Sequence, residues 1–294
     1  MSWIFGVGVL AVVVLGLDRL ATRIVRPNLQ PVDRSLPALG LPHEDVVIDA
    51  GEVSLAAWVT RRNGTDPDAD AEAPEMGGLQ SRAPVVILAH GWTANHGVVA
   101  RLGEPLARRG HTVLFYDVRG HGRNPPRSTV TFKDFRDDAL AVIRWANHRF
   151  RHRPLVFVGH SMGGAAGVVA AADGARVDGL VLIATPSDVL RITAEYLSDQ
   201  GLPGDLLVTI LRPFFWLRVG GTFGPLTPSR RIGELEIPIL MIQPELDARV
   251  VRSHADRLSS AAGISYHVIE DREHTDVLSD GRTLELVEDF LSTV

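Results

Sequence analysis

The chain of 294 residues contains no cysteine. This absence excludes disulfide bonds, thiolate metal sites and a cysteine nucleophile. A large excess of charge of one sign is also absent, because the formal net charge is only −5. No basic patch points to a nucleic-acid partner. The 11 histidines lack the spacing of metal ligands, so we expect neither a metal ion nor a cofactor.

The N-terminus has no charged residue over residues 3–17, and apolar residues continue beyond Asp18 and Arg19. A bilayer span needs about 20 mostly apolar residues, so residues 1–25 are predicted to form a membrane anchor. A cleaved signal peptide would need a basic start and a small-residue cleavage site, and the sequence has neither. A signal peptide and a buried helix stay as alternatives. Basic residues follow the apolar run and none precedes it, which predicts a single-pass anchor with the folded domain in the cytoplasm.

The remaining chain is long enough for one large α/β domain with a sizeable core. Residues 26–45 are rich in proline and polar residues and predict a linker, which leaves residues 46–294 as the folded domain. Alternating apolar residues at 46–48 and 53–60 predict a β-hairpin. The Gly-, Pro- and acid-rich residues 63–82 predict a surface loop.

Apolar runs alternate with helical patterns from residue 84 onward. Strands are predicted at residues 85–89, 112–116, 155–158, 180–184, 237–242 and 264–269. Continuous apolar strands that alternate with helices indicate a mostly parallel sheet with helices on both faces. Residues 185–231 interrupt this alternation without a clear strand, and they predict a lid inserted above the carboxyl ends of the strands.

The sequence GHSMGG at residues 159–164 lies between a predicted strand and an Ala/Val-rich helix. A G-x-S-x-G in this context is typical of a nucleophile elbow, a sharp turn that strains and exposes the serine, here Ser161. Gly159 and Gly163 are expected because a Cβ atom would collide with the adjoining strand or helix. His160 occupies the variable position and should point away from the reaction. The alternative is a turn that only joins two elements.

A serine hydroxyl is a poor nucleophile near neutral pH, and it needs a base and an acid that orients the base. On an α/β sheet the chain order is serine, acid, histidine. Asp247 follows the strand that ends near residue 242 and is the candidate acid, with Glu245 and Asp188 as alternatives. His274 follows the last predicted strand and is the candidate base.

Two backbone N–H groups are expected to bind the oxyanion of a tetrahedral intermediate. One is that of Met162, directly after the candidate nucleophile. The other is that of Trp92, because Gly91 lets the loop after the strand ending at Ala89 turn inward. The alternative for Trp92 is a pocket wall, and both roles are compatible because the donor belongs to the main chain.

Together these motifs resemble the α/β-hydrolase superfamily from about residue 45 to the C-terminus. The resemblance rests on His90-Gly91-Trp92, on the D-x-R-G-H-G loop at residues 117–122, and on the elbow, acid and base. It implies an α/β-hydrolase fold, with a mostly parallel central sheet, helices on both faces and a helical lid. It also implies a scaffold role beside the active site for Asp117 and Arg119.

This sequence departs from the superfamily pattern in its apolar N-terminus and in Gln243-Pro244, where many relatives carry a glycine-containing loop before the acid.

The resemblance implies a serine hydrolase that cleaves carboxylic esters through an acyl-enzyme intermediate. Apolar residues 214–216 in the predicted lid, together with the predicted anchor, favour lipid-like acyl groups. Alternatives are amide or peptide hydrolysis, as in proline-aminopeptidase-like relatives, acyl transfer to another acceptor, and a receptor or scaffold without activity. The sequence predicts neither the acyl and alcohol groups nor the oligomeric state.

Overall fold

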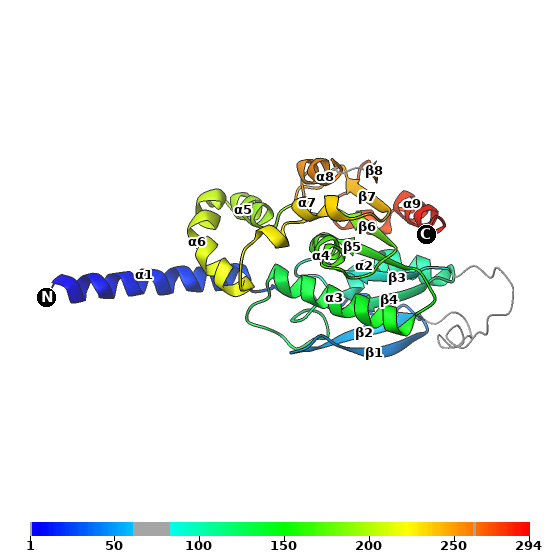
Figure 1. Ribbon diagram of the computed structural model, residues 1–294, viewed down its shortest axis with the longest axis horizontal. Coiled ribbons are helices and arrows are strands. Elements are labelled where there is room, and N and C mark those ends of the chain that lie inside the picture. Colours follow the sequence, from blue (N-terminus) through cyan, green and yellow to red (C-terminus); the bar gives the residue numbers. More distant parts are fainter. Residues whose placement is uncertain (1, 61–82, 261–262) are drawn as a thin grey trace.

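One sheet of eight strands organises the part of the chain that the computed structural model describes, namely residues 2–60, 83–260 and 263–294, with side chains from residue 7 onward. In Figure 1 the strands follow one another from β1 at the bottom to β8 near the top, and α3 lies across them. The predicted loop at residues 63–82 lies outside the described residues. The strand order is β1-β2-β4-β3-β5-β6-β7-β8. The strands are β1 His43–Asp49, β2 Ser54–Thr60, β3 Val85–Ala89, β4 Thr112–Tyr116, β5 Leu155–His160, β6 Gly179–Ile183, β7 Ile239–Pro244 and β8 Ile264–Ile269.

The predicted hairpin and parallel strands are confirmed. β1 and β2 pair antiparallel, β2 joins β4 antiparallel, and all neighbours from β4 through β8 run parallel. Parallel strands need crossover connections, and the helices supply them. The carboxyl ends of the parallel strands therefore lie at one edge of the sheet, where the loops that follow them can meet.

Both faces of the sheet are covered, which explains why the central strands are apolar without alternation. Successive side chains of a strand enter different clusters, so Ile87 packs with the helices of one face and Leu88 with those of the other. The helices on the Ile87 face are α3 Phe132–Arg149, α4 Met162–Ala172 and α8 Arg252–Leu258. The helices on the Leu88 face are α2 His96–Arg108 and α9 Gly281–Leu291.

The predicted lid interval lies between β6 and β7 and contains α5 Val189–Asp199 and α6 Gly204–Val219. These helices pack against each other through Leu197 and Val208 in a cluster of their own, and Val219 at the end of α6 joins the cluster on the Ile87 face. Whether the interval opens and closes as a lid stays a prediction. Short helical segments complete the described fold: η1 Gly224–Leu226, α7 Pro228–Arg231, η2 Ile232–Glu234 and η3 Asp276–Ser279.

The N-terminal helix α1 Ser2–Ile24 projects from the body of the protein (Figure 1). Its C-terminal part packs on α6, where Ala21 is fully buried beside Leu211. An ion pair of 2.7 Å between Asp18 of α1 and Arg218 of α6 joins the same two helices. α1 is therefore attached to the predicted lid interval and not to the central sheet.

The structure does not support the predicted membrane anchor at residues 1–25. Among the helices of the described residues, none is long and apolar enough to cross a membrane. The charged residues Asp18, Arg19 and Arg23 lie within α1 and shorten its uncharged part. The cytoplasmic placement depended on that span and stays an untested prediction.

Residues 26–45, predicted as a linker, run closely along the domain. Leu36 and Leu41 are buried in the cluster that contains α2. The backbone N–H of Gln30 donates to the carbonyl of Thr93 at 3.1 Å, and the Asn95 side chain donates to the carbonyl of Gln30 at 3.1 Å. This segment therefore reaches the loop after β3.

Helix α2 approaches the sheet at Gly103, where an added Cβ would lie 2.4 Å from both Leu88 and Phe115. We expect Gly103→Ala to lower the free energy of unfolding by roughly 1–3 kcal/mol through overpacking, although alanine favours a helix by about 1 kcal/mol. Urea denaturation measures this change. Gly233→Ala is the matched control, because nothing lies within 4 Å of its Cβ position. A Gly103→Ala variant as stable as the wild type would contradict this packing.

Candidate active site

The turn between β5 and α4 consists of one residue, Ser161, with φ 55° and ψ −123°. A positive φ is uncommon for a residue with a side chain and stores strain unless its surroundings enforce it. Here the Ser161 N–H donates to the Ile183 carbonyl of β6 at 2.8 Å, and the Ser161 carbonyl accepts from Gly164 at 3.0 Å. The strained backbone is therefore held from the strand side and from the helix side.

The glycines around Ser161 allow three segments to approach one another. A Cβ on Gly159 would lie 2.4 Å from the Cα of Gly164, and one on Gly163 would lie 2.5 Å from the carbonyl oxygen of Ala89. A Cβ on Gly91 would lie 2.9 Å from the Cβ of Ser161. Backbone cannot give way as a flexible side chain does, so the elbow requires glycine at 159 and 163.

Asp247 and His274 come together across the loops that follow β7 and β8. His274 Nδ1 lies 2.8 Å from Asp247 Oδ2, and both residues are buried. An ionised carboxylate only accepts hydrogen bonds, so Nδ1 carries the proton and Nε2 keeps the lone pair that a base needs. The other oxygen, Asp247 Oδ1, accepts from the backbone N–H groups of Arg249 at 2.9 Å and Val250 at 2.8 Å.

Gln243, which belongs to the departure from the superfamily pattern, has a structural role. Its buried side chain donates to the carbonyl of Val250 at 2.8 Å, which closes the loop that carries Asp247. The two alternative acids have other partners. Asp188 caps α5 by accepting from Leu190 and Arg191, and Glu245 accepts from the N–H of Asp271.

Ser161 and His274 line one pocket of about 290 Å³, its open mouth included. The remaining lining residues are Gln30, Gly91, Trp92, Ala94, Val98, His160, Arg249 and Thr275. Within the described contacts, no hydrogen bond joins the Ser161 hydroxyl to His274. Such bonds often tighten only when substrate binds. Sequence reasoning missed Gln30 and Arg249 as pocket residues, because neither belongs to a motif.

The two predicted oxyanion donors flank the nucleophile. Met162 is the first residue of α4, where backbone N–H groups have no partner within the helix and the helix dipole is positive. Trp92 lines the pocket, and its ring packs against His121 and Phe135 at centroid distances of 5.7 and 6.0 Å. The Trp92 backbone N–H takes part in none of the hydrogen bonds of the described residues. It is therefore free to bind an oxyanion.

Comparison with known proteins supports the fold on which this pocket lies. A family model described as the alpha/beta hydrolase fold matches residues 84–211. An esterase of Pyrococcus furiosus superposes with a TM-score of 0.67 at 18% identity, over 91% of this chain and 98% of that one. A proline iminopeptidase of Mycobacterium smegmatis superposes with a TM-score of 0.59 at 18% identity, over 85% and 98%.

The chain has the α/β-hydrolase fold.

Similar sequences match a smaller part of the chain. The pimeloyl-acyl-carrier-protein methyl ester esterase of Xylella fastidiosa is 36% identical over 109 residues, which are 37% of this chain and 39% of that protein. The protein of the same name from Stenotrophomonas maltophilia is 33% identical over 113 residues, 38% of this chain and 40% of that protein. The chain thus matches about two fifths of the length of these relatives.

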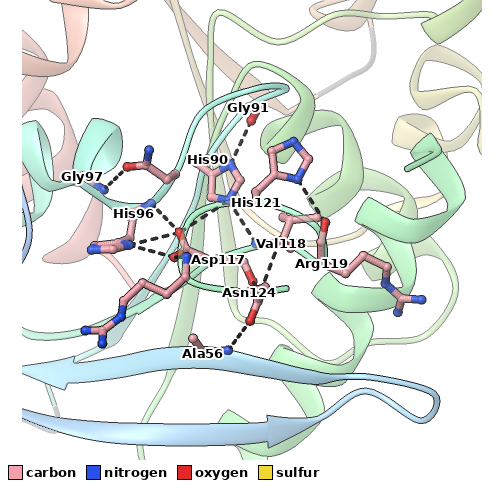
Figure 2. A network of polar contacts seen from close by, with 12 residues as sticks. Ala56, His90, Gly91, His96, Gly97, Asp117, Val118, Arg119, His121 and Asn124 are labelled. Atoms are coloured by element: carbon pink, nitrogen blue, oxygen red, sulfur yellow. Dashed lines mark hydrogen bonds and ion pairs between the residues drawn. The ribbon is translucent and has the colours of Figure 1, made fainter. Parts of the chain in front are cut away.

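The D-x-R-G-H-G loop is the centre of a buried polar network (Figure 2). Asp117 accepts from the backbone N–H of His96 at 2.7 Å, from His96 Nδ1 at 2.9 Å and from the N–H of Arg123 at 2.8 Å. Arg119 binds the buried carboxylate of Asp138 at 2.5 Å. These contacts favour the scaffold role predicted for Asp117 and Arg119.

The same network supports the loop that carries Trp92. His90 Nδ1 donates to the Gly91 carbonyl at 2.8 Å, and His90 Nε2 accepts from the Val118 N–H at 3.0 Å. His121 Nε2 accepts from the N–H of Thr93 at 3.3 Å. Figure 2 shows both imidazoles between the two loops. Two neutral histidines, each with a lone pair turned to a backbone N–H, thus hold the loop on either side of Trp92.

Acid should destabilise the fold through His90. Burial, with a smaller effect of neighbouring His121, lowers the pKa of His90 from 6.5 to about 4. Between these values the unfolded chain binds a proton that the folded chain does not, so stability is full above pH 6.5 and falls as the pH decreases toward 4. We expect this group to remove about 2 kcal/mol from the free energy of unfolding between about pH 7 and about pH 4.5, measured by urea denaturation.

His90→Gln provides the control for this prediction, because glutamine does not titrate. Its free energy of unfolding should depend less steeply on pH than that of the wild type. The difference in slope should correspond to about one fewer proton taken up on unfolding. Equal pH dependence in the two proteins would show that His90 is not the group responsible.

Proposed function

We propose that this protein is a serine hydrolase that cleaves carboxylic esters with the triad Ser161, His274 and Asp247. One observation carries the proposal: the Asp247–His274 pair of 2.8 Å faces the same pocket as a serine held at positive φ between a strand and a helix. Neither feature is needed for stability alone, and together they supply an oriented base beside an exposed hydroxyl.

In the proposed reaction His274 Nε2 takes the proton of Ser161 as Oγ attacks the ester carbonyl. The N–H groups of Trp92 and Met162 stabilise the oxyanion. Collapse of the tetrahedral intermediate expels the alcohol, which takes the proton from His274 and leaves an acyl group on Ser161. Water attacks this acyl-enzyme while His274 accepts its proton, and collapse releases the carboxylic acid and returns the proton to Ser161. Asp247 stabilises the imidazolium in both halves.

We propose esters with small acyl groups as substrates. The lid aromatics expected to favour lipid-like chains lie elsewhere: Phe214 and Phe215 pack with α1, Trp216 is about half exposed, and none of the three lines the pocket. The pocket instead includes the polar side chains of Gln30 and Arg249. The methyl ester esterase among the similar sequences supports an ester substrate.

A fluorophosphonate probe tests the nucleophile, because it reacts with a serine that an adjacent base activates. We expect the wild-type protein to be labelled and Ser161→Ala to be unlabelled, with ester hydrolysis reduced at least about 10⁴-fold. Mass spectrometry of the labelled peptide identifies the serine. A wild-type protein that is folded but unlabelled would contradict the proposal and favour a binding role.

Ser187 offers a matched control for this experiment. Its hydroxyl lies 2.8 Å from His254 Nδ1, whose Nε2 lies 2.7 Å from Glu195, so it also has a histidine and an acid behind it. Ser187 and His254 are, however, fully buried, and no substrate reaches them. Ser187→Ala should therefore keep full labelling per folded molecule.

The substrate class is tested with p-nitrophenyl acetate, butyrate and decanoate and with the matching anilides. We expect kcat/KM to be highest for the short esters and to fall by about tenfold or more for decanoate, because the pocket is only about 290 Å³ in volume and includes Gln30 and Arg249. Anilide cleavage should be slower than cleavage of the matching ester. A maximum at decanoate would restore the lipid-like hypothesis, and comparable anilide rates would favour an amide hydrolase.

A further inference from the structure

His160 lies between the nucleophile and the base, although it takes no part in the proposed proton transfer. It is the last residue of β5, directly before Ser161, and its backbone pairs with Ile183 of β6. Its side chain is buried, and its Nε2 lies 2.7 Å from the carbonyl oxygen of His274. The two imidazole rings also face each other, with centroids 4.7 Å apart and planes tilted by 50°.

The direction of this hydrogen bond determines the protonation of His160. A carbonyl oxygen only accepts, so His160 Nε2 carries the proton and donates it. Nδ1 then holds the lone pair, and among the described residues this buried atom has no hydrogen-bond partner. Burial, followed by the nearby His274, lowers the pKa of His160 to about 3, so the ring stays neutral at neutral pH.

This arrangement is unfavourable for a residue that only fills space. A buried nitrogen without a partner is destabilising, and an apolar side chain of similar size would avoid it. The favourable contact that histidine provides here is the bond to the His274 carbonyl. Asp247 holds the ring of His274 through Nδ1, but it does not hold the His274 backbone. His160 therefore holds the backbone of His274, whereas Asp247 holds its ring.

We propose that His160 is a positioning residue that fixes the catalytic base relative to the nucleophile. This inference rests on the proposed function. β5 is a central strand with neighbours on both sides, so the elbow is rigid. His274 lies in a loop after the edge strand β8. A hydrogen bond from the residue next to Ser161 to the backbone of His274 ties the loop to that rigid frame.

Two substitutions that differ by one methylene test this role. His160→Gln places an amide N–H near the position of Nε2 and can still reach the His274 carbonyl. His160→Asn places its amide near the position of Nδ1 and cannot. His43→Phe is the matched control, because it removes a side-chain hydrogen bond to a backbone carbonyl, that of Leu41 at 2.6 Å, at the start of β1 and outside the pocket.

The measurement is the rate constant of fluorophosphonate labelling together with its end point. We expect His160→Asn to slow labelling by about 10- to 100-fold with a full end point, since a misplaced base reacts slowly but is present. His160→Gln should stay within about fivefold of the wild type, and His43→Phe should not differ from it. In ester hydrolysis the loss should appear in kcat and not in KM.

A merely structural role would lower the end point, because unfolded molecules do not react, and would leave the rate constant of the folded ones unchanged. That result overturns the proposal. The proposal is also overturned if His160→Asn is labelled at the wild-type rate, or if His160→Gln is slowed as much as His160→Asn.

A measurement without substrate separates this inference from the proposed function. The proton on His274 Nδ1, which bridges to Asp247, gives a low-field proton NMR signal whose position depends on the geometry of that pair. We expect His160→Asn to shift or broaden this signal and His160→Gln to preserve it. If the wild-type protein proved unreactive, the proposed function would fail, whereas the signal would still decide the role of His160. An unchanged signal in His160→Asn would overturn the inference.

Discussion

The structure around the pocket depends on one constraint, the turn of a single residue between β5 and α4. Ser161 has a positive φ because the strand ends at residue 160 and the helix begins at residue 162. That conformation is possible only because glycines on both sides let the helix approach the neighbouring backbone. The turn places the hydroxyl at the carboxyl edge of the sheet and leaves the first N–H groups of α4 free beside it. The nucleophile and one oxyanion donor thus arise from the same local geometry.

The partners of Ser161 come from loops that are held by buried polar contacts. The loop after β3 is supported by His90 and His121 from the network around Asp117. The loop after β7 is closed by Gln243, and it presents one oxygen of Asp247 to the backbone and the other to His274. Each support is a neutral or acidic group with a defined donor or acceptor role. The site therefore has fixed protonation states as well as fixed positions, and acidification affects both.

Much of this was predictable because it is encoded locally. Continuous runs such as residues 85–89 predict buried parallel strands, and G-x-S-x-G between a strand and a helix predicts the elbow. Chain order pointed to Asp247 and His274, and the contact between them agrees with that choice. The membrane anchor was inferred from the length of the uncharged N-terminal run, and the structure does not support it, because no helix of the described residues is long and apolar enough to cross a membrane. The pocket residues Gln30 and Arg249 carried no pattern that could have identified them.

By itself the sequence determined the succession of strands and helices along the chain, the position of the strained serine and the candidates for acid and base. These depend on residue type and spacing, which act over a few neighbouring residues. Only the tertiary structure decided which acid meets the histidine, that Gln243 holds the acid loop, and that residues 26–45 reach the pocket. It also turned His160 from a residue expected to point away into one bonded to the backbone of His274. These contacts join segments far apart in the chain, and they exist only once the sheet has brought the carboxyl ends of its strands together.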